Sequence, residues 1–80
     1  MPMHHEAPPF PLPFTGERFE ALREDYLRME ALAVIDHTQA GILIIKLNGA
    51  SKWLPRAWVR IERAPRGGRY LLVKYPRWCD

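Results

Sequence analysis

The stretch GILIIKLNGASKWLPRAWVRIE, residues 41–62, decides the predicted fold because strand-forming and turn-forming residues alternate along it. Asn48 and Gly49 form the dipeptide most typical of a tight β-hairpin, with apolar and β-branched residues on the strand before it. Pro55 cannot donate a ladder hydrogen bond and is predicted to end the second strand of that hairpin. Applied along the rest of the chain, the same reasoning predicts five short antiparallel strands, at 31–37, 41–48, 51–54, 58–63 and 69–75.

The segment before these strands has a helical period instead. Its apolar side chains recur at steps of three and four residues, which places them on one face of a helix. Thr15 is a suitable N-cap for a helix that begins near Gly16. The predicted apolar face consists of Phe19, Leu22, Tyr26, Met29 and Ala33. The sequence therefore predicts an α+β fold, in which an N-terminal helix packs on a small, strongly curled antiparallel sheet of about five strands, a partial barrel.

Residues 1–14 form a proline-rich segment that holds five of the eight prolines of the chain. Because proline fixes φ and lacks an N–H group, this segment is predicted to be an extended arm, and residues 15–80 a single domain. Phe10, Leu12 and Phe14 stand at alternate positions between the prolines. We expect these side chains to lie against the surface of the domain. In the alternative interpretation, the arm is a proline-rich ligand for a partner.

Charge is distributed unevenly along the 80 residues. Residues 1–40 hold three basic and seven acidic side chains, a sum of −4, whereas residues 41–80 hold nine basic and two acidic ones, a sum of +7. Aromatic residues are interleaved with the cations of the second half, which is typical of surfaces that bind nucleic acid or an acidic protein partner. In the alternative interpretation, the arginines are a solvated rim, and Trp53 and Trp58 anchor the core. The candidate binding residues are Lys52, Arg56, Trp58, Arg60, Arg63, Arg66, Arg69, Tyr70 and Lys74.

A tight turn at residues 65–68 would pair the last two predicted strands, and the strand period then assigns their side chains to two faces. One face is predicted to be basic and aromatic, with Trp58, Arg60, Glu62, Tyr70, Leu72 and Lys74. The opposite face is predicted to be apolar, with Val59, Ile61, Leu71 and Val73.

No motif for nucleophilic or metal-dependent catalysis stands out in the sequence. Cys79 is the single cysteine, so it cannot form an internal disulfide, and Ser51, the only serine, stands in no nucleophile motif. We therefore expect no enzyme activity, no metal and no cofactor. An alternative interpretation brings together three acid–base side chains, Asp36, His37 and Glu62.

The hydropathy pattern indicates a soluble protein. The longest apolar run, residues 42–45, is far shorter than the roughly 18 residues of a membrane helix. The N-terminus lacks the basic region and apolar core of a signal peptide. We expect a cytoplasmic protein that makes no contact with a membrane.

Residues 48–62 also resemble a pattern found in small proteins of phages and other mobile elements. In that pattern, an Asn-Gly or Asp-Gly turn is followed by a tryptophan, a leucine or isoleucine, and Pro-Lys-Ser before a second strand. Ala57 and Trp58 depart from the pattern, and the resemblance covers about residues 30–63. Trp53, Leu54, Pro55 and Arg56 match in type and order, and Val59 and Ile61 match the strand that follows.

This resemblance implies a mobile-element accessory protein, and a small domain without catalytic groups is similar to the anti-CRISPR proteins that phages encode. It implies a non-catalytic inhibitor or adaptor that binds a host CRISPR effector complex through the basic and aromatic residues, inside a bacterial cell. The alternative is a small nucleic-acid-binding barrel whose contacts are Trp58, Tyr70 and the nearby arginines. An exposed edge strand is compatible with either a monomer or a homodimer.

Overall fold

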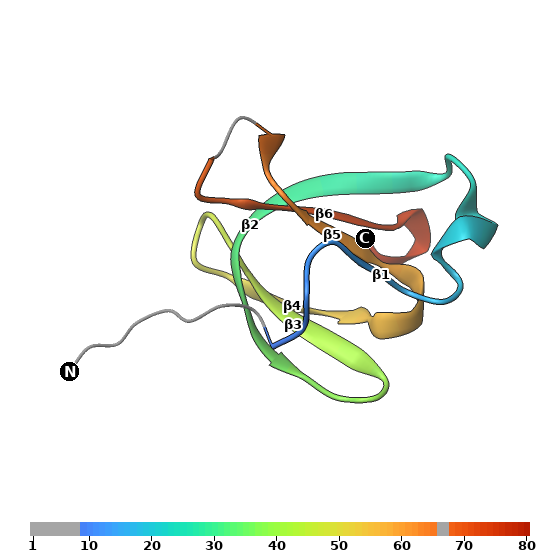
Figure 1. Ribbon diagram of the computed structural model, residues 1–80, viewed down its shortest axis with the longest axis horizontal. Coiled ribbons are helices and arrows are strands. Elements are labelled where there is room, and N and C mark those ends of the chain that lie inside the picture. Colours follow the sequence, from blue (N-terminus) through green and yellow to red (C-terminus); the bar gives the residue numbers. More distant parts are fainter. Residues whose placement is uncertain (1–8, 66–67) are drawn as a thin grey trace.

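Six antiparallel strands form one open sheet in the computed structural model, which describes residues 9–65 and 68–80 (Figure 1). The order of strands across the sheet is β1-β5-β6-β2-β3-β4. The strands are β1 (Phe14–Thr15), β2 (Tyr26–His37), β3 (Gly41–Lys46), β4 (Ser51–Pro55), β5 (Arg60–Arg63) and β6 (Leu71–Pro76). Single 3₁₀ turns join or follow them, and these are η1 (Phe19–Leu22), η2 (Arg56–Trp58) and η4 (Arg77–Cys79).

The long strand β2 joins the two halves of the sheet. Its first half, Tyr26 to Ala31, pairs with β6, and its second half, Ala31 to His37, pairs with β3. The register with β3 shifts between Ala31 and Ala33 and again between Val34 and Asp36. Such irregularities bend a strand and raise its twist, which lets one strand belong to both halves. Figure 1 shows β2 curving along the molecule beside β6 and then beside β3.

The N-terminal helix predicted after Thr15 does not form, and this part of the fold prediction was wrong. The structure has only the single turn η1 in that segment and is already extended at Tyr26, where β2 begins. Arg23, with φ of +56°, lies in the left-handed region and ends the turn. The helical spacing was misleading because the residues from Tyr26 onward also alternate with a strand period. As a strand, this segment forms hydrogen bonds with both β6 and β3.

The predicted strongly curled partial barrel was also wrong. The strand order leaves β1 at one edge of the sheet and β4 at the other, so the sheet stays open. The fold is therefore almost entirely β, and within residues 9–65 and 68–80 it contains no helix longer than one short turn. The strands predicted at 41–48 and 51–54 are present with slightly different bounds, as β3 and β4.

One face of the sheet carries the core. The four side chains that the strand period assigns to the apolar face, Val59, Ile61, Leu71 and Val73, are all buried, so this assignment is confirmed. Phe10, Leu12 and Phe14 pack against the same core, as predicted from their alternation with the prolines. The buried cluster consists of Ala31, Ile42, Ile44, Leu54, Val59, Ile61, Leu71, Val73 and Tyr75.

The turns follow the chemistry of their sequences. Gly49 has φ of +91°, a conformation that glycine adopts without strain, and Asn48 Oδ1 accepts a hydrogen bond from the Ala50 N–H at 2.9 Å. At the other hairpin, the Thr38 hydroxyl accepts hydrogen bonds from the N–H groups of Ala40 at 3.2 Å and Gly41 at 3.0 Å. Both hairpins of the central strands are thus closed by local side-chain contacts.

Trp53 is not a core residue, since 51% of it is exposed on the outer face of β4. Its ring covers Gly41 of the neighbouring strand, where an added Cβ would lie 3.1 Å from the ring atom Cε3. Trp58 is half-buried in η2. The alternative that both tryptophans anchor the core is therefore wrong for Trp53.

Candidate binding surface

Three cations and one hydroxyl lie in register on the outer face of the sheet, opposite the core. Thr15 of β1 pairs with Arg60 of β5, Arg60 pairs with Lys74 of β6, and Lys74 pairs with Arg28 of β2. Directly opposed residues on neighbouring antiparallel strands have Cβ atoms about 5 Å apart. Arg60, Lys74 and Arg28 therefore form a continuous row across three strands, which we call the cationic row.

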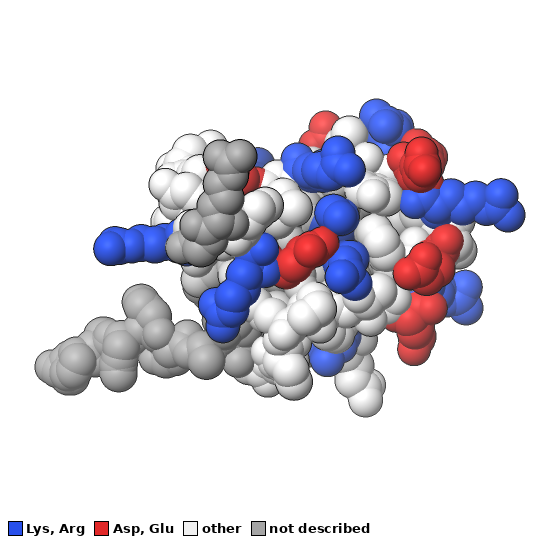
Figure 2. Space-filling view, turned by 45° about the horizontal axis from the view of Figure 1, so that its top comes forward, with Lys and Arg blue, Asp and Glu red and all other residues white. Residues whose placement is uncertain are grey.

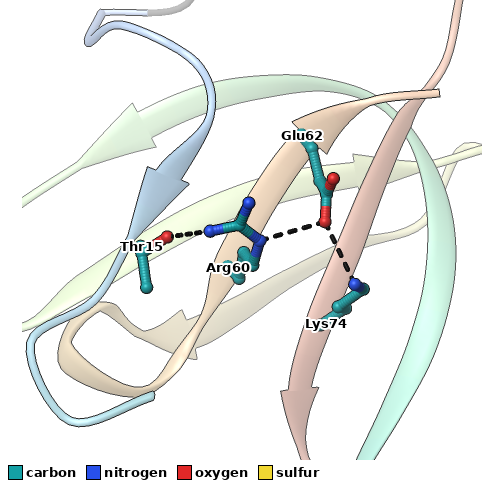
Figure 3. A network of polar contacts seen from close by, with 4 residues as sticks. All are labelled: Thr15, Arg60, Glu62 and Lys74. Atoms are coloured by element: carbon teal, nitrogen blue, oxygen red, sulfur yellow. Dashed lines mark hydrogen bonds and ion pairs between the residues drawn. The ribbon is translucent and has the colours of Figure 1, made fainter. Parts of the chain in front are cut away.

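Glu62 binds two members of this row (Figure 3). Its Oε2 lies 3.0 Å from Arg60 Nε and 3.1 Å from Lys74 Nζ. Arg60 also donates a hydrogen bond to the Thr15 hydroxyl. Partial burial by itself would raise the pKa of Glu62, but the hydrogen bonds and positive charges of Lys74 and Arg60 outweigh it, so this pKa lies below its ordinary value. The carboxylate thus offsets the repulsion between two opposed cations.

Tyr26 supports the other end of the cationic row. The guanidinium carbon of Arg28 lies 5.5 Å from the centre of its ring, and Lys74 Nζ lies 5.7 Å from it. Phe19 packs against the same ring with a centroid separation of 5.1 Å. These cation–π contacts hold the two cations close to the sheet. Figure 2 shows one face of the molecule, on which Lys and Arg side chains are interspersed with acidic ones.

A second group of aromatic and basic side chains lies at η2. We call it the tryptophan cluster, and its members are Arg18, Trp58 and Trp78. The rings of Trp58 and Trp78 meet edge to face, with centroids 5.7 Å apart. The guanidinium carbon of Arg18 lies 5.8 Å from the centre of the Trp58 ring. Trp78 is 63% exposed, the highest value among the large apolar side chains that the structure exposes in its described part. Two tryptophans and an arginine are thus presented together at the surface.

The nine candidate residues from the sequence do not form one surface. Only Arg60 and Lys74 lie together in the cationic row. Arg63, Arg69 and Tyr70 are exposed at the far end of the β5–β6 hairpin, and Arg66 lies outside the described residues. The remaining candidates are Lys52 on β4 and Arg56 and Trp58 on η2.

Four residues of these two groups were missed in the sequence, namely Arg18, Tyr26, Arg28 and Trp78. The first three fall in the segment that was predicted to be helical, in the acidic half of the chain. A strand period beginning at Tyr26 would have placed Arg28 on the outer face, but which strand lies beside it depends on a long-range pairing. Trp78 was visible as an aromatic residue beside Arg77 but lies beyond the last predicted strand.

The acid–base side chains Asp36, His37 and Glu62 are not brought together. Asp36 and His37 lie at the end of β2 that pairs with β3. Glu62 lies on β5 in register with Leu72, and Leu72 in turn pairs with Glu30 in the other half of β2. Among the residues that the structure describes, no group of three or more histidine, cysteine or acidic side chains is arranged to hold a metal ion.

No helix in the described part of the chain has the length and apolar character needed to cross a membrane.

Comparison with known proteins adds no relative to these observations. Protein-family models, curated protein sequences and solved structures were all compared with the chain, and none of them matches it.

Proposed function

We propose that this chain is a non-catalytic inhibitor or adaptor of the anti-CRISPR type, which docks on a protein surface of a host CRISPR effector complex. The observation that carries the proposal is the tryptophan cluster, in which Trp78 is 63% exposed beside Trp58 and Arg18. The resemblance of residues 48–62 to mobile-element proteins supports the choice of a CRISPR complex as the partner. In this role the protein acts in the cytoplasm of a bacterial cell, as a monomer or a homodimer.

The composition of the tryptophan cluster favours a protein partner. Trp, Tyr and Arg are the residues most enriched among those whose truncation costs the most binding energy in protein interfaces. A large, rigid ring such as that of Trp78 loses little conformational entropy when a partner covers it. The contact between the two indole rings also holds Trp78 in one orientation before a partner arrives.

A pull-down against purified CRISPR effector complexes of different types tests this proposal. We expect one of them to retain the protein, and we expect Trp78→Ala to weaken the affinity by at least about tenfold, as loss of an interface anchor does. Arg18→Glu should weaken binding in the same direction. Trp53→Ala is the matched control, because Trp53 is also half exposed but lies on β4 outside the cluster. Failure of every effector complex to bind would refute the proposal.

The second candidate function is nucleic-acid binding, and the cationic row favours it. Three cations spaced across neighbouring strands match the repeating negative charge of a phosphate backbone. Tyr26, which already contacts two of them, is an aromatic ring at the same place. Glu62 neutralises part of this charge, which is why a protein partner is the preferred proposal.

Fluorescence anisotropy with labelled DNA and RNA separates the two functions. If the row contacts phosphates, affinity falls steeply with salt, with a log–log slope of roughly −2 to −3 for about three duplex phosphates. Arg28→Gln should then reduce the slope by about one. Arg69→Gln is the control, because Arg69 is exposed at a distance from the row. Absence of binding at low salt would reject nucleic acid as the ligand.

A further inference from the structure

Two open hollows meet at Arg56 and Gln39, where η2 approaches the turn between β2 and β3. The larger has a volume of about 390 Å³, and we call it the Arg56 hollow. It is lined by His37, Thr38, Gln39 and Arg56. Each of these side chains can donate a hydrogen bond, and none of them is acidic.

Arg56 is held firmly in this position. Its backbone N–H donates to the Ala40 carbonyl oxygen at 3.0 Å, which ties η2 to the turn. Its guanidinium carbon lies 5.0 Å from the centre of the Phe14 ring and 5.4 Å from that of Phe10. A guanidinium that lies over aromatic faces keeps the N–H groups of its edge available for a ligand. Among the described residues, no carboxylate forms an ion pair with it.

The imidazole of His37 converges on the same place. Its Nδ1 lies 3.5 Å from Nη1 of Arg56, and its ring meets Phe10 edge to face at 5.9 Å. The Asp36 carboxylate accepts the backbone N–H of His37 at 2.7 Å. Phe10 contacts both the imidazole of His37 and the guanidinium of Arg56, so the spacing between these two groups is defined.

We propose that the Arg56 hollow binds a phosphate monoester group. The fork of a guanidinium matches two oxygens of such a group. A phosphate monoester has a third terminal oxygen with further lone pairs, which the imidazole of His37 and the amide of Gln39 can satisfy. A carboxylate has only two oxygens, so one that makes a bidentate contact with Arg56 has no third oxygen to offer the other donors. Inorganic phosphate, phosphoserine and the 5′-phosphate of an oligonucleotide share this chemistry. The site shares no residue with the tryptophan cluster, although both include a residue of η2, and it does not depend on the proposed function.

Nuclear magnetic resonance titration of the full chain with inorganic phosphate, at constant ionic strength, tests the site. We expect saturable shifts of the amide resonances of Thr38, Gln39 and Arg56. Arg56→Gln should weaken the affinity roughly tenfold or more, since it removes a charge-assisted bidentate contact. Arg69→Gln, which changes an exposed arginine elsewhere, should leave the affinity unchanged. Circular dichroism establishes that each variant is folded.

Arg56→Lys covers the case in which the glutamine variant does not fold. It keeps the charge but loses the fork, and we expect an affinity several-fold weaker than that of the native chain. Parallel titrations with phosphoserine and with a dinucleotide that does or does not carry a 5′-phosphate identify which source binds best. The proposal is overturned if phosphate causes no saturable shift, if folded Arg56 variants bind it as well as the native chain, or if acetate binds as tightly as phosphate.

Discussion

Gly16 occupies a position where the neighbouring backbone leaves no space for a side chain. Its N–H donates to the Val59 carbonyl oxygen at 2.7 Å, and the N–H of Arg18 donates to the Ala57 carbonyl oxygen at 2.7 Å. These two hydrogen bonds hold the segment against the chain around η2. A methyl group on Gly16 would overlap the carbonyl oxygens of Arg56 and Ala57, which are backbone atoms. We expect Gly16→Ala to lower the free energy of unfolding by about 1–3 kcal/mol, measured by urea denaturation.

Gly68→Ala is the matched control for this substitution. An added Cβ there would lie 3.4 Å from the Ala64 Cβ and 3.9 Å from the Pro65 carbonyl oxygen, both ordinary contacts. We expect the free energy of unfolding to change by less than about 0.5 kcal/mol. Equal stability of the two variants would mean that the segment around Gly16 does not pack closely on η2.

Among single elements, β5 and β6 owe part of their pairing energy to Glu62. Arg60 and Lys74 are directly opposed on these strands, and like charges in that position destabilise a sheet. All three groups are partly exposed, with side-chain exposures of 19–30%, so solvent weakens the effect. We expect Glu62→Gln to lower the free energy of unfolding at pH 7 by about 0.5–1 kcal/mol in a denaturation experiment.

The pH dependence of that difference follows from the lowered pKa of Glu62. A carboxyl group whose pKa is lower in the folded state stabilises the protein above its unfolded pKa, about 4.3, and loses this contribution as the pH falls through the folded value. The difference in free energy of unfolding between the native chain and Glu62→Gln should therefore be constant near neutral pH and should disappear in acid. Glu30→Gln, on the same face but in no ion pair among the described residues, should show no such gap. A gap that persists below pH 3 would contradict the role of the carboxylate.

The strand β2 shows which part of the fold the sequence could predict. Strands flanked by clear turn residues, such as β3 and β4, were predicted because Asn48, Gly49 and Pro55 act locally. The first half of β2 was predicted to be helical, because Tyr26 and Met29 lie at a helical spacing as well as on an alternating strand. The choice between these periods depends on β6, which follows much later in the chain, and no local pattern reports that pairing.

At the scale of the whole molecule, the candidate surface was predictable only in its composition. The sequence identified the basic and aromatic residues of the second half, but not which of them are neighbours. Arg60 and Lys74 were correctly assigned to one face because β5 and β6 pair antiparallel, as predicted; residues 66 and 67 of the predicted turn lie outside the described residues. Arg28 completes their row through β2, and Arg18 reaches Trp58 through the packing of two short turns, so both contacts join distant parts of the chain.

An open sheet in a domain of this size needs additional cover over its core, because small domains bury a limited fraction of their surface. Part of that cover comes from Phe10, Leu12 and Phe14 of the N-terminal segment. We expect Phe10→Ala to lower the free energy of unfolding by about 1–2 kcal/mol, less than for a fully buried phenylalanine, and the melting temperature by roughly 5–15 °C. Leu32→Ala, which truncates a side chain that is 46% exposed, should change the free energy by less than about 0.5 kcal/mol. If calorimetry finds the two variants equally stable, the segment around Phe10 rests on the sheet without contributing to the core, and the β-strands alone hold the fold together.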